Sequence, residues 1–212
     1  MIPAENSIKN IVLIANSFNP SIFSHHWLVS NDLVKEEEFL PQSIFTNQLV
    51  QVVTNHMVLL VLPDQLIIRF NKTGIEKESI IKLQKIIELL PHIPYSMMGM
   101  NFVHLMDDDI NGQSTSRKYF YNSSQPLFKL FDTEDAKFGV YLSRNIKDGV
   151  RLKLDIKPVD FIADGTTSSK IQFSFNYHVQ LELEGANKRI IEILPQWDEF
   201  DKITNETLAE LK

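Results

Sequence analysis

The sequence predicts an α+β protein, with one or more antiparallel meander sheets and helices packed on one face. The stretch from Ile171 to Leu183 alternates apolar and polar residues for longer than most strands last, which indicates a strand with one buried face. Three shorter strand-like runs, at 44–54, 57–62 and 66–71, follow one another with breaks short enough for antiparallel hairpins. Parallel crossovers need a dozen or more residues between strands, so a meander is predicted here.

A strand-then-helix unit occurs twice in the chain. The strand-like segment IIRFN at 67–71 precedes a helix that ends in IIELLP at 86–91, and the long strand precedes a helix that ends in IIEILP at 190–195. Two copies of one such unit would make this a duplicated domain. The match is six residues of common types, so chance remains the alternative explanation.

We expect the two halves to meet in the least regular stretch of the chain. That stretch mixes turn-forming residues with aromatic ones, and it is too long for an idle linker, so part of it should pack or bind. The prediction is one compact unit made of a first half at 1–110, an irregular aromatic connection at 111–135 and a second half at 136–212.

The remaining elements follow from local signals for helix and strand ends. In chain order they are a strand at 9–17, a helix capped by Ser21, a helix at 76–90 started by a capping box of Thr73 and Glu76, a methionine-rich strand at 95–106, strands at 138–142 and 150–157, a helix at 186–194 and a last helix beginning near Trp197.

Composition excludes several classes of protein. The 212 residues are 43% hydrophobic and 23% charged, which is typical of a folded domain. A formal net charge of −6 argues against nonspecific nucleic-acid binding, and the lack of cysteine removes disulfides, thiolate catalysis and most structural zinc sites. The first residues lack the pattern of a secretory signal, and no apolar run approaches the ~20 residues of a membrane helix. We expect a cytoplasmic protein with no nucleic-acid or membrane partner.

Motifs for catalysis, cofactors or metals do not stand out. The chain has no Gly-x-Ser-x-Gly elbow, P-loop or dinucleotide fingerprint, so no catalytic, cofactor-binding or metal-binding residue is assigned. Asp107, Asp109, Asn111 and Gly112 fit the first half of a calcium loop, but Lys118 takes the place of the bidentate glutamate. A solvated acidic turn is therefore the preferred interpretation of Asp107 to Asn111.

His178 is the other residue at which chemistry could be sought. It lies in the polar row of the long strand, among Gln172, Asn176 and Gln180, and that row could line a groove. An exposed sheet face is the simpler interpretation. A hydrolase with a polar site near His178 or near the Asp107 loop is thus an alternative, not the first choice.

Aromatic residues are the candidates for binding a partner. Tyr119, Phe120 and Tyr121 cluster in the irregular connection, and Trp197 and Phe200 lie at helical spacing on the last helix. Large aromatic side chains dominate both cores and interfaces. For Trp197 and Phe200 the core is the first interpretation and a partner surface the second.

The arrangement of residues 43–106, a meander followed by a helix, resembles the SecB-like α+β proteins. That resemblance implies an oligomer that holds unfolded chains or antitoxins on apolar grooves. The chain is also similar to uncharacterised prokaryotic proteins in which a helix ending LLPHxP precedes a GxNF strand, here LLPHIP at 89–94 and GMNF at 99–102. That second family carries no settled activity.

Together these features favour a cytosolic, non-enzymatic interaction protein that works as a homo-oligomer or as one subunit of a complex. A SecB-like chaperone and a hydrolase are the two alternatives. An interaction protein should expose an apolar patch, whereas an enzyme should bring titratable groups together in a pocket.

Overall fold

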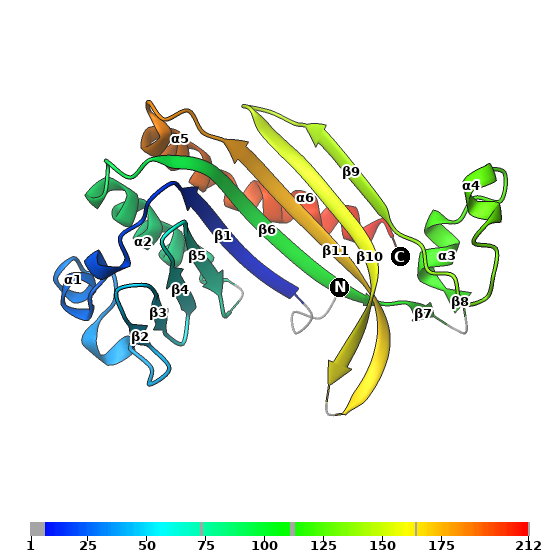
Figure 1. Cartoon of the computed structure of the whole chain (residues 1–212), viewed down its shortest axis with the longest axis horizontal. Coiled ribbons are helices and arrows are strands. Elements are labelled where there is room, and N and C mark those ends of the chain that lie inside the picture. The colour runs from blue at the N-terminus through cyan, green and yellow to red at the C-terminus, as the bar shows by residue number, and fades with distance from the viewer. Residues whose placement is uncertain (1–6, 73, 111–112, 164, 212) are drawn as a thin grey trace.

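Nine antiparallel strands form one continuous sheet, which is the body of the molecule (Figure 1). This computed structural model describes residues 7–72, 74–110, 113–163 and 165–211. From one edge to the other, the strand order is β2, β3, β4, β5, β1, β6, β11, β10 and β9. The predicted α+β class with an antiparallel sheet is confirmed.

The strands of this sheet are β1 (Ser7–Ala15), β2 (Ile44–Phe45), β3 (Val50–Val53), β4 (Met57–Val61), β5 (Gln65–Phe70), β6 (Tyr95–Asp107), β9 (Val140–Asn145), β10 (Val150–Ala163) and β11 (Thr166–Gln180). A separate small hairpin contains β7 (Asp109–Ile110) and β8 (Gln113–Ser114). The α-helices are α1 (His25–Ser30), α2 (Glu76–Leu89), α3 (Thr115–Phe120), α4 (Pro126–Lys129), α5 (Ala186–Ile193) and α6 (Trp197–Ala209).

Apart from the short edge strand β2, which among the described residues occurs in the first half alone, the two halves of the sheet have the same strand order. In the first half β1 is followed by the meander of β3, β4 and β5, and β5 returns to pair with β1 before α2 begins. In the second half β6 is followed by β9, β10 and β11, and β11 returns to pair with β6 before α5 begins. The two first strands pair at the centre, with Asn10 opposite Asn101. Duplication and the predicted division of the chain at 111–135 both stay hypotheses; the repeated strand order begins at β1 and again at β6.

Helices α2, α5 and α6 lie together behind the sheet in Figure 1. Their buried residues recur at helical spacing, which predicts one face against the strands. On α2 the buried apolar residues are Ile80, Leu83, Ile86 and Ile87; on α5 they are Ala186, Ile190 and Ile193; and on α6 they are Trp197, Phe200 and Leu208. Among the described residues, no helix combines the length and apolar character needed to cross a membrane.

The long strand β11 has the alternation that the sequence predicts. Its odd residues from Ile171 to Val179 are buried against the helices, and the even residues between them are partly exposed. The Tyr177 ring stacks on Phe200 of α6 with ring centroids 4.3 Å apart. Trp197 packs between the two halves, because its ring lies 4.9 Å from Phe70 of β5 and 4.5 Å from Phe102 of β6. These aromatic contacts join the halves into one core.

Several predicted element ends differ from the structure. The first helical segment starts at Pro20 with Asn19 as its cap, and Ser24, not Ser21, caps α1. The run predicted at 44–54 is broken into β2 and β3 by a turn in which the Thr46 hydroxyl accepts backbone N–H groups. The predicted cap Thr73 lies outside the described residues. In such turns, short polar side chains form hydrogen bonds with backbone groups that would otherwise pair between strands.

The β10–β11 hairpin is longer than the sequence predicts. Pairing with β9 ends at Ile156 and pairing with β6 ends at Lys170, but β10 and β11 stay paired to Ala163 and Thr166. This two-stranded arm projects beyond the sheet (Figure 1). The threonines and serines at 166–169 are residues typical of loops, so the sequence gives no sign that the pairing continues this far. Side chains at the end of such a ribbon have no second layer to cover them, and Ile162 is exposed.

Candidate protein-binding surface

A small lobe, residues 115–138, projects from one end of the sheet and contains α3 and α4 (Figure 1). The buried Asp108 carboxylate accepts the Ser116 N–H at 2.9 Å, and the Ser114 hydroxyl accepts the Arg117 N–H at 3.2 Å. Both bonds satisfy backbone donors at the start of α3 that have no partner within the helix. The lobe is thereby fixed to the end of β6.

Three aromatic rings form the interior of the lobe. The ring centroids of Tyr121, Phe128 and Phe138 lie 5.2 to 5.9 Å from one another. The Arg117 guanidinium lies over the Tyr121 ring at 4.3 Å and forms an ion pair with Asp132. Aromatic pairs and cation–π contacts of this kind hold a small unit together without a large core.

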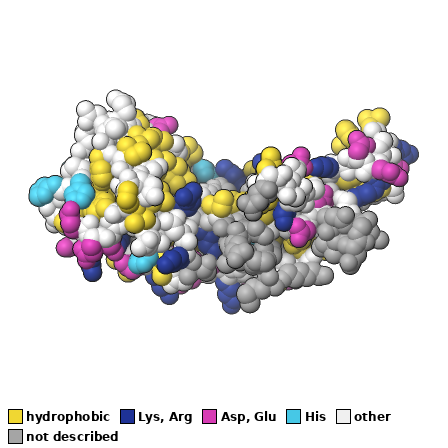
Figure 2. Space-filling model, turned by 90° about the horizontal axis from the view of Figure 1, so that it is seen from below, with side chains coloured by type: hydrophobic (Ala, Val, Ile, Leu, Met, Phe, Trp, Pro, Cys, Tyr) yellow, Lys and Arg dark blue, Asp and Glu magenta, His cyan; other side chains and the backbone are white. Residues whose placement is uncertain are grey.

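Several large apolar side chains are exposed on the lobe among polar and charged ones. Leu127, Leu130 and Phe131 are 66%, 79% and 54% exposed, and Tyr119 is 36% exposed while its hydroxyl donates to the Leu211 carbonyl. Figure 2 shows hydrophobic side chains on this lobe at the right end of the molecule. Water contact with neighbouring large apolar side chains is unfavourable, which makes this group a candidate binding surface.

Strand β9 follows the lobe directly and forms the edge of the sheet. A Cβ on Gly139 would lie 2.4 Å from the Ile156 carbonyl oxygen, so only glycine fits where the chain enters β9. Tyr141 and Leu142 on this strand are 61% and 52% exposed. Within the described part of the chain, β10 is the one strand that pairs with β9. The lobe and the β9 edge are named together below as the lobe–edge surface.

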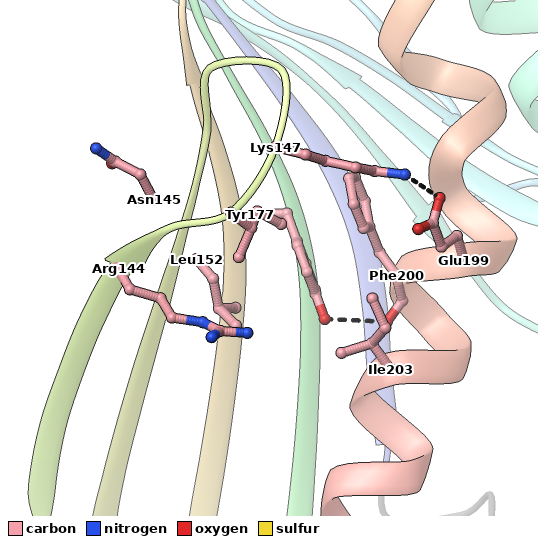
Figure 3. Close-up of a pocket in the computed structure, with 9 residues that line it drawn as sticks. Arg144, Asn145, Lys147, Leu152, Tyr177, Glu199, Phe200 and Ile203 are labelled. Carbon is pink, nitrogen blue, oxygen red and sulfur yellow. Dashed lines mark hydrogen bonds and ion pairs between the residues drawn. The ribbon is translucent and has the colours of Figure 1, made fainter.

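A cavity of about 280 Å³ lies between the last part of β9 and helix α6 (Figure 3). Arg144, Leu152 and Tyr177 form one row across β9, β10 and β11 at its floor. Phe200 and Ile203 of α6 close the opposite side. The cavity therefore has an apolar interior, with the Arg144 guanidinium at its margin (Figure 3).

Polar contacts fix the walls of this cavity. The Tyr177 hydroxyl is within hydrogen-bond distance of the Phe200 carbonyl at 3.1 Å and of the Thr204 hydroxyl at 3.0 Å. Burial raises the pKa of Tyr177 overall, although the Thr204 hydrogen bond and the Arg144 charge lower it, so the phenol stays neutral at pH 7. Lys147 forms an ion pair with Glu199 across the cavity (Figure 3).

The structure separates the five predicted partner-binding residues into two groups. Tyr119, Phe120 and Tyr121 lie together on the lobe, Tyr119 at its surface and the other two partly buried. Trp197 and Phe200 are 2% and 0% exposed, so they belong to the core and offer no surface to a partner. Their helical spacing predicts one face of α6, and that face packs against the sheet.

His178 and the Asp107 loop do not form a common site. His178 lies opposite Gly99 on the sheet face away from the helices; burial lowers its pKa, and the positive charges of Lys153 and Arg151 lower it further. The Asp107 carboxylate is paired with Lys170 at 2.6 Å. His178 and Lys170 are eight positions apart on β11, or about 26 Å at the rise of a strand.

The acidic loop has a structural role in its described part. Asp107 pairs with Lys170, and Asp108 accepts hydrogen bonds from Ser114 and Ser116 at the start of α3. Asn111 and Gly112, which the calcium pattern also needs, lie outside the described residues. Asp107 is the one predicted calcium ligand whose side chain is described, so the choice between a calcium loop and an acidic turn stays a prediction.

One cluster of possible metal ligands occurs elsewhere, at Glu38, His56 and Glu78. The Lys82 ammonium lies 3.6 Å from Glu38 and 3.3 Å from Glu78 and so neutralises both carboxylates. Burial raises the pKa of Glu38, but the Lys35 N–H bond and the Lys82 charge lower it overall. Lysine therefore supplies the positive charge that a metal would bring, and no metal is assigned to the cluster.

Buried charges join β1, α2 and α6 beneath the sheet. The Lys9 ammonium lies 2.7 Å from Asp201 and 3.6 Å from Glu76. His104 is buried beside them, and burial together with the Lys9 charge lowers its pKa to about 4, although Asp201 opposes this. Its Nε2 has no hydrogen-bond partner among the described residues. None of these groups lines the cavity, so we assign them to the stability of the core.

No protein-family model matches this chain, and neither does any curated protein. The lobe–edge surface and its cavity therefore have to be interpreted from their own geometry.

Sequence reasoning missed Leu127, Leu130, Tyr141, Leu142 and Arg144. The segment PLFKLF at 126–131 carries a signal, because its apolar residues lie on a helix too short to bury them. Strand β9, with the sequence VYLSRN, carries no such signal for binding. Its residues neither alternate clearly between buried and exposed nor show the charges that commonly protect an edge strand.

Proposed function

We propose that this protein is a non-enzymatic binding protein of the cytoplasm that acts as a subunit of a protein complex. A protein partner docks on the lobe–edge surface. The observation that carries this proposal is the group of exposed apolar side chains at Leu127, Leu130 and Phe131 on a lobe stabilised from within. Patches of this kind mark interaction sites in otherwise polar surfaces.

Binding is favoured over catalysis by the polar groups as well. An active site brings titratable groups together at a cavity. Here His178 and Asp107 lie at different places along the sheet, and the buried His104, Lys9 and Asp201 stabilise contacts between helices and strands. The hydrolase alternative named His178 and the Asp107 loop as separate places for a polar site, and the distance between them means that each would have to form a site without the other.

A triple variant, Leu127→Asn with Leu130→Asn and Phe131→Asn, tests the proposal. The tagged protein is produced in its native cells, and its co-purifying proteins are quantified by mass spectrometry. We expect at least one stoichiometric partner with the wild type and a loss of about tenfold or more with the variant. Surface substitutions of this kind change stability little, so the variant should remain folded.

The matched control is Ile81→Asn with Leu183→Asn. These two side chains are 63% and 70% exposed but lie on α2 and after β11, away from the lobe. The control should keep the partner. Equal loss in both variants, or a wild-type protein that co-purifies with nothing, contradicts the proposal.

A SecB-like chaperone is the second candidate, favoured by apolar exposure at several separate places. Besides the lobe, Phe161 and Ile162 are exposed on the arm and Ile44 on β2. A chaperone for unfolded chains binds extended apolar segments at more than one place. It should suppress the heat aggregation of an unrelated reporter enzyme at a stoichiometric ratio, which a subunit with one specific partner should not do.

A further inference from the structure

We propose that the partner adds an extended segment as a strand to β9, with one apolar side chain in the cavity and an acidic side chain beside Arg144. The inference rests on the proposed function, because it names how the same partner is held. It concerns the backbone of β9 and the cavity at the end of that strand, and neither of these belongs to the lobe.

The backbone phase of β9 is set by its turn. The Ile146 N–H donates to the Val150 carbonyl at 2.9 Å. Because backbone groups in a strand alternate in direction, the N–H and C=O groups of Arg144, Leu142 and Val140 also point toward β10. The N–H and C=O groups of Tyr141, Ser143 and Asn145 consequently point away from the sheet. Together they form a row of donors and acceptors that a further strand can satisfy.

The two edges of the sheet differ in their protection. At the opposite edge β2 is only Ile44–Phe45, too short to accept a strand of useful length. Strand β9 spans Val140–Asn145 and has neither proline nor lysine, the residues that commonly block edge pairing. Its one charged residue is Arg144, and Arg144 lies at the cavity.

The cavity is suited to one side chain. Its volume of about 280 Å³ lies just below the range of about 300–1,000 Å³ that is usual for small-molecule sites. Leu152, Tyr177 and Ile203 give it an apolar lining, and it opens beside the last part of β9. In a strand, alternate side chains point to one face, so an added strand would present one of them to the cavity.

Charge selects the chemistry of the added segment. Lys147 is neutralised by Glu199, but Arg144 forms no ion pair with any described residue. A carboxylate beside Arg144 would form a charge-assisted hydrogen bond. An acidic residue near the apolar anchor is therefore the expected feature of the partner segment.

A random twelve-residue peptide library, displayed on phage and selected on the whole protein, provides the probe. Selected peptides are synthesised, and their Kd is measured by fluorescence anisotropy. We expect a large apolar residue with an acidic residue within two positions of it. Amide hydrogen exchange should slow at Tyr141, Ser143 and Asn145 when peptide binds.

Two pairs of variants separate strand addition from other contacts. Ser143→Pro removes an outward N–H, whereas Ser143→Ala keeps it; the Ser143 hydroxyl has no partner among the described residues, so its loss breaks no bond. Arg144→Glu reverses the charge at the cavity, whereas Lys153→Glu reverses one on the opposite face of the same hairpin. Ser143→Pro and Arg144→Glu should each weaken peptide binding about tenfold or more, and the two controls less than about threefold.

Three results overturn the inference. Selected peptides could bind Ser143→Pro as tightly as the wild type, or no peptide could bind with a Kd below about 100 μM. Alternatively, the β9 amides could already be protected in a concentration-dependent dimer, which would make a second copy of the chain the occupant. If Ser143→Pro fails to fold, the comparison of Arg144→Glu with Lys153→Glu decides alone.

The two proposals fail separately. A co-purifying partner that is lost in the lobe variant but retained by Ser143→Pro and Arg144→Glu leaves the proposed function standing and removes strand addition. If no partner depends on the lobe, the proposed function is wrong. Selected peptides that bind along β9 would then show strand addition at this edge independently of that function.

Discussion

The two ends of the sheet are built from the same strand order but present different surfaces. At the β2 end the edge strand is two residues long, and Phe23, Leu28 and Leu33 around α1 are buried. At the β9 end the edge has six residues, and the lobe beside it exposes Leu130 and Phe131. Ile44 and Phe45 are also exposed at the β2 end, so the ends differ chiefly in the length of the edge strand and in the presence of the lobe, which the proposed docking would use.

Breaking the shared core should have the largest effect. Trp197→Ala removes a side chain that contacts Phe70 of one half and Phe102 of the other, so we expect a loss of about 3–5 kcal/mol in the free energy of unfolding. Urea denaturation measures the change. Phe131→Ala on the lobe is the control and should lie within about 0.5 kcal/mol of the wild type.

The buried charges should contribute almost as much. Lys9→Met leaves Glu76 and Asp201 without their cation, which we expect to cost about 3–5 kcal/mol in unfolding free energy. Lys77→Met removes a surface ion pair with Asp198 and should change stability by less than about 1 kcal/mol. Similar losses in both variants would mean that the buried cluster is not special.

His104 should make stability depend on pH. Its pKa is about 4 in the folded protein and near 6.5 when unfolded, so the unfolded state binds more protons between these values. Stability is then complete above pH 6.5 and falls by about 3 kcal/mol as the pH drops to 4. His104→Leu should remove this part of the slope in denaturation curves; an unchanged slope would assign it to other groups.

A methyl group at the entry to β9 should disturb one end of the sheet alone. Gly139→Ala places a Cβ against the Ile156 carbonyl, with an expected cost of about 1–3 kcal/mol. Hydrogen exchange should accelerate in β9 and not in β3. Gly99→Ala meets the Asn176 side chain at 2.8 Å, which can move, so it should cost less. Faster exchange at both ends would contradict independent edges.

Local pattern predicted much of the fold but little of the candidate site. The alternation in Ile171 to Val179 and the 3.6-residue spacing on α2 predicted both elements and their buried faces, because these patterns act within one segment. Tyr119, Phe120 and Tyr121 were found from their clustering alone. Leu142 and Arg144 were not found, since an edge strand is defined by a neighbour that is missing and not by its own residues.

The sequence by itself determined the main strands and the helices α2, α5 and α6, since these depend on residues a few positions apart. Tertiary structure decided that β1 pairs with β6 and that β9 is an edge of the sheet. Those outcomes depend on hydrogen bonds and packing between segments far apart in the chain, for which no single segment carries a signal.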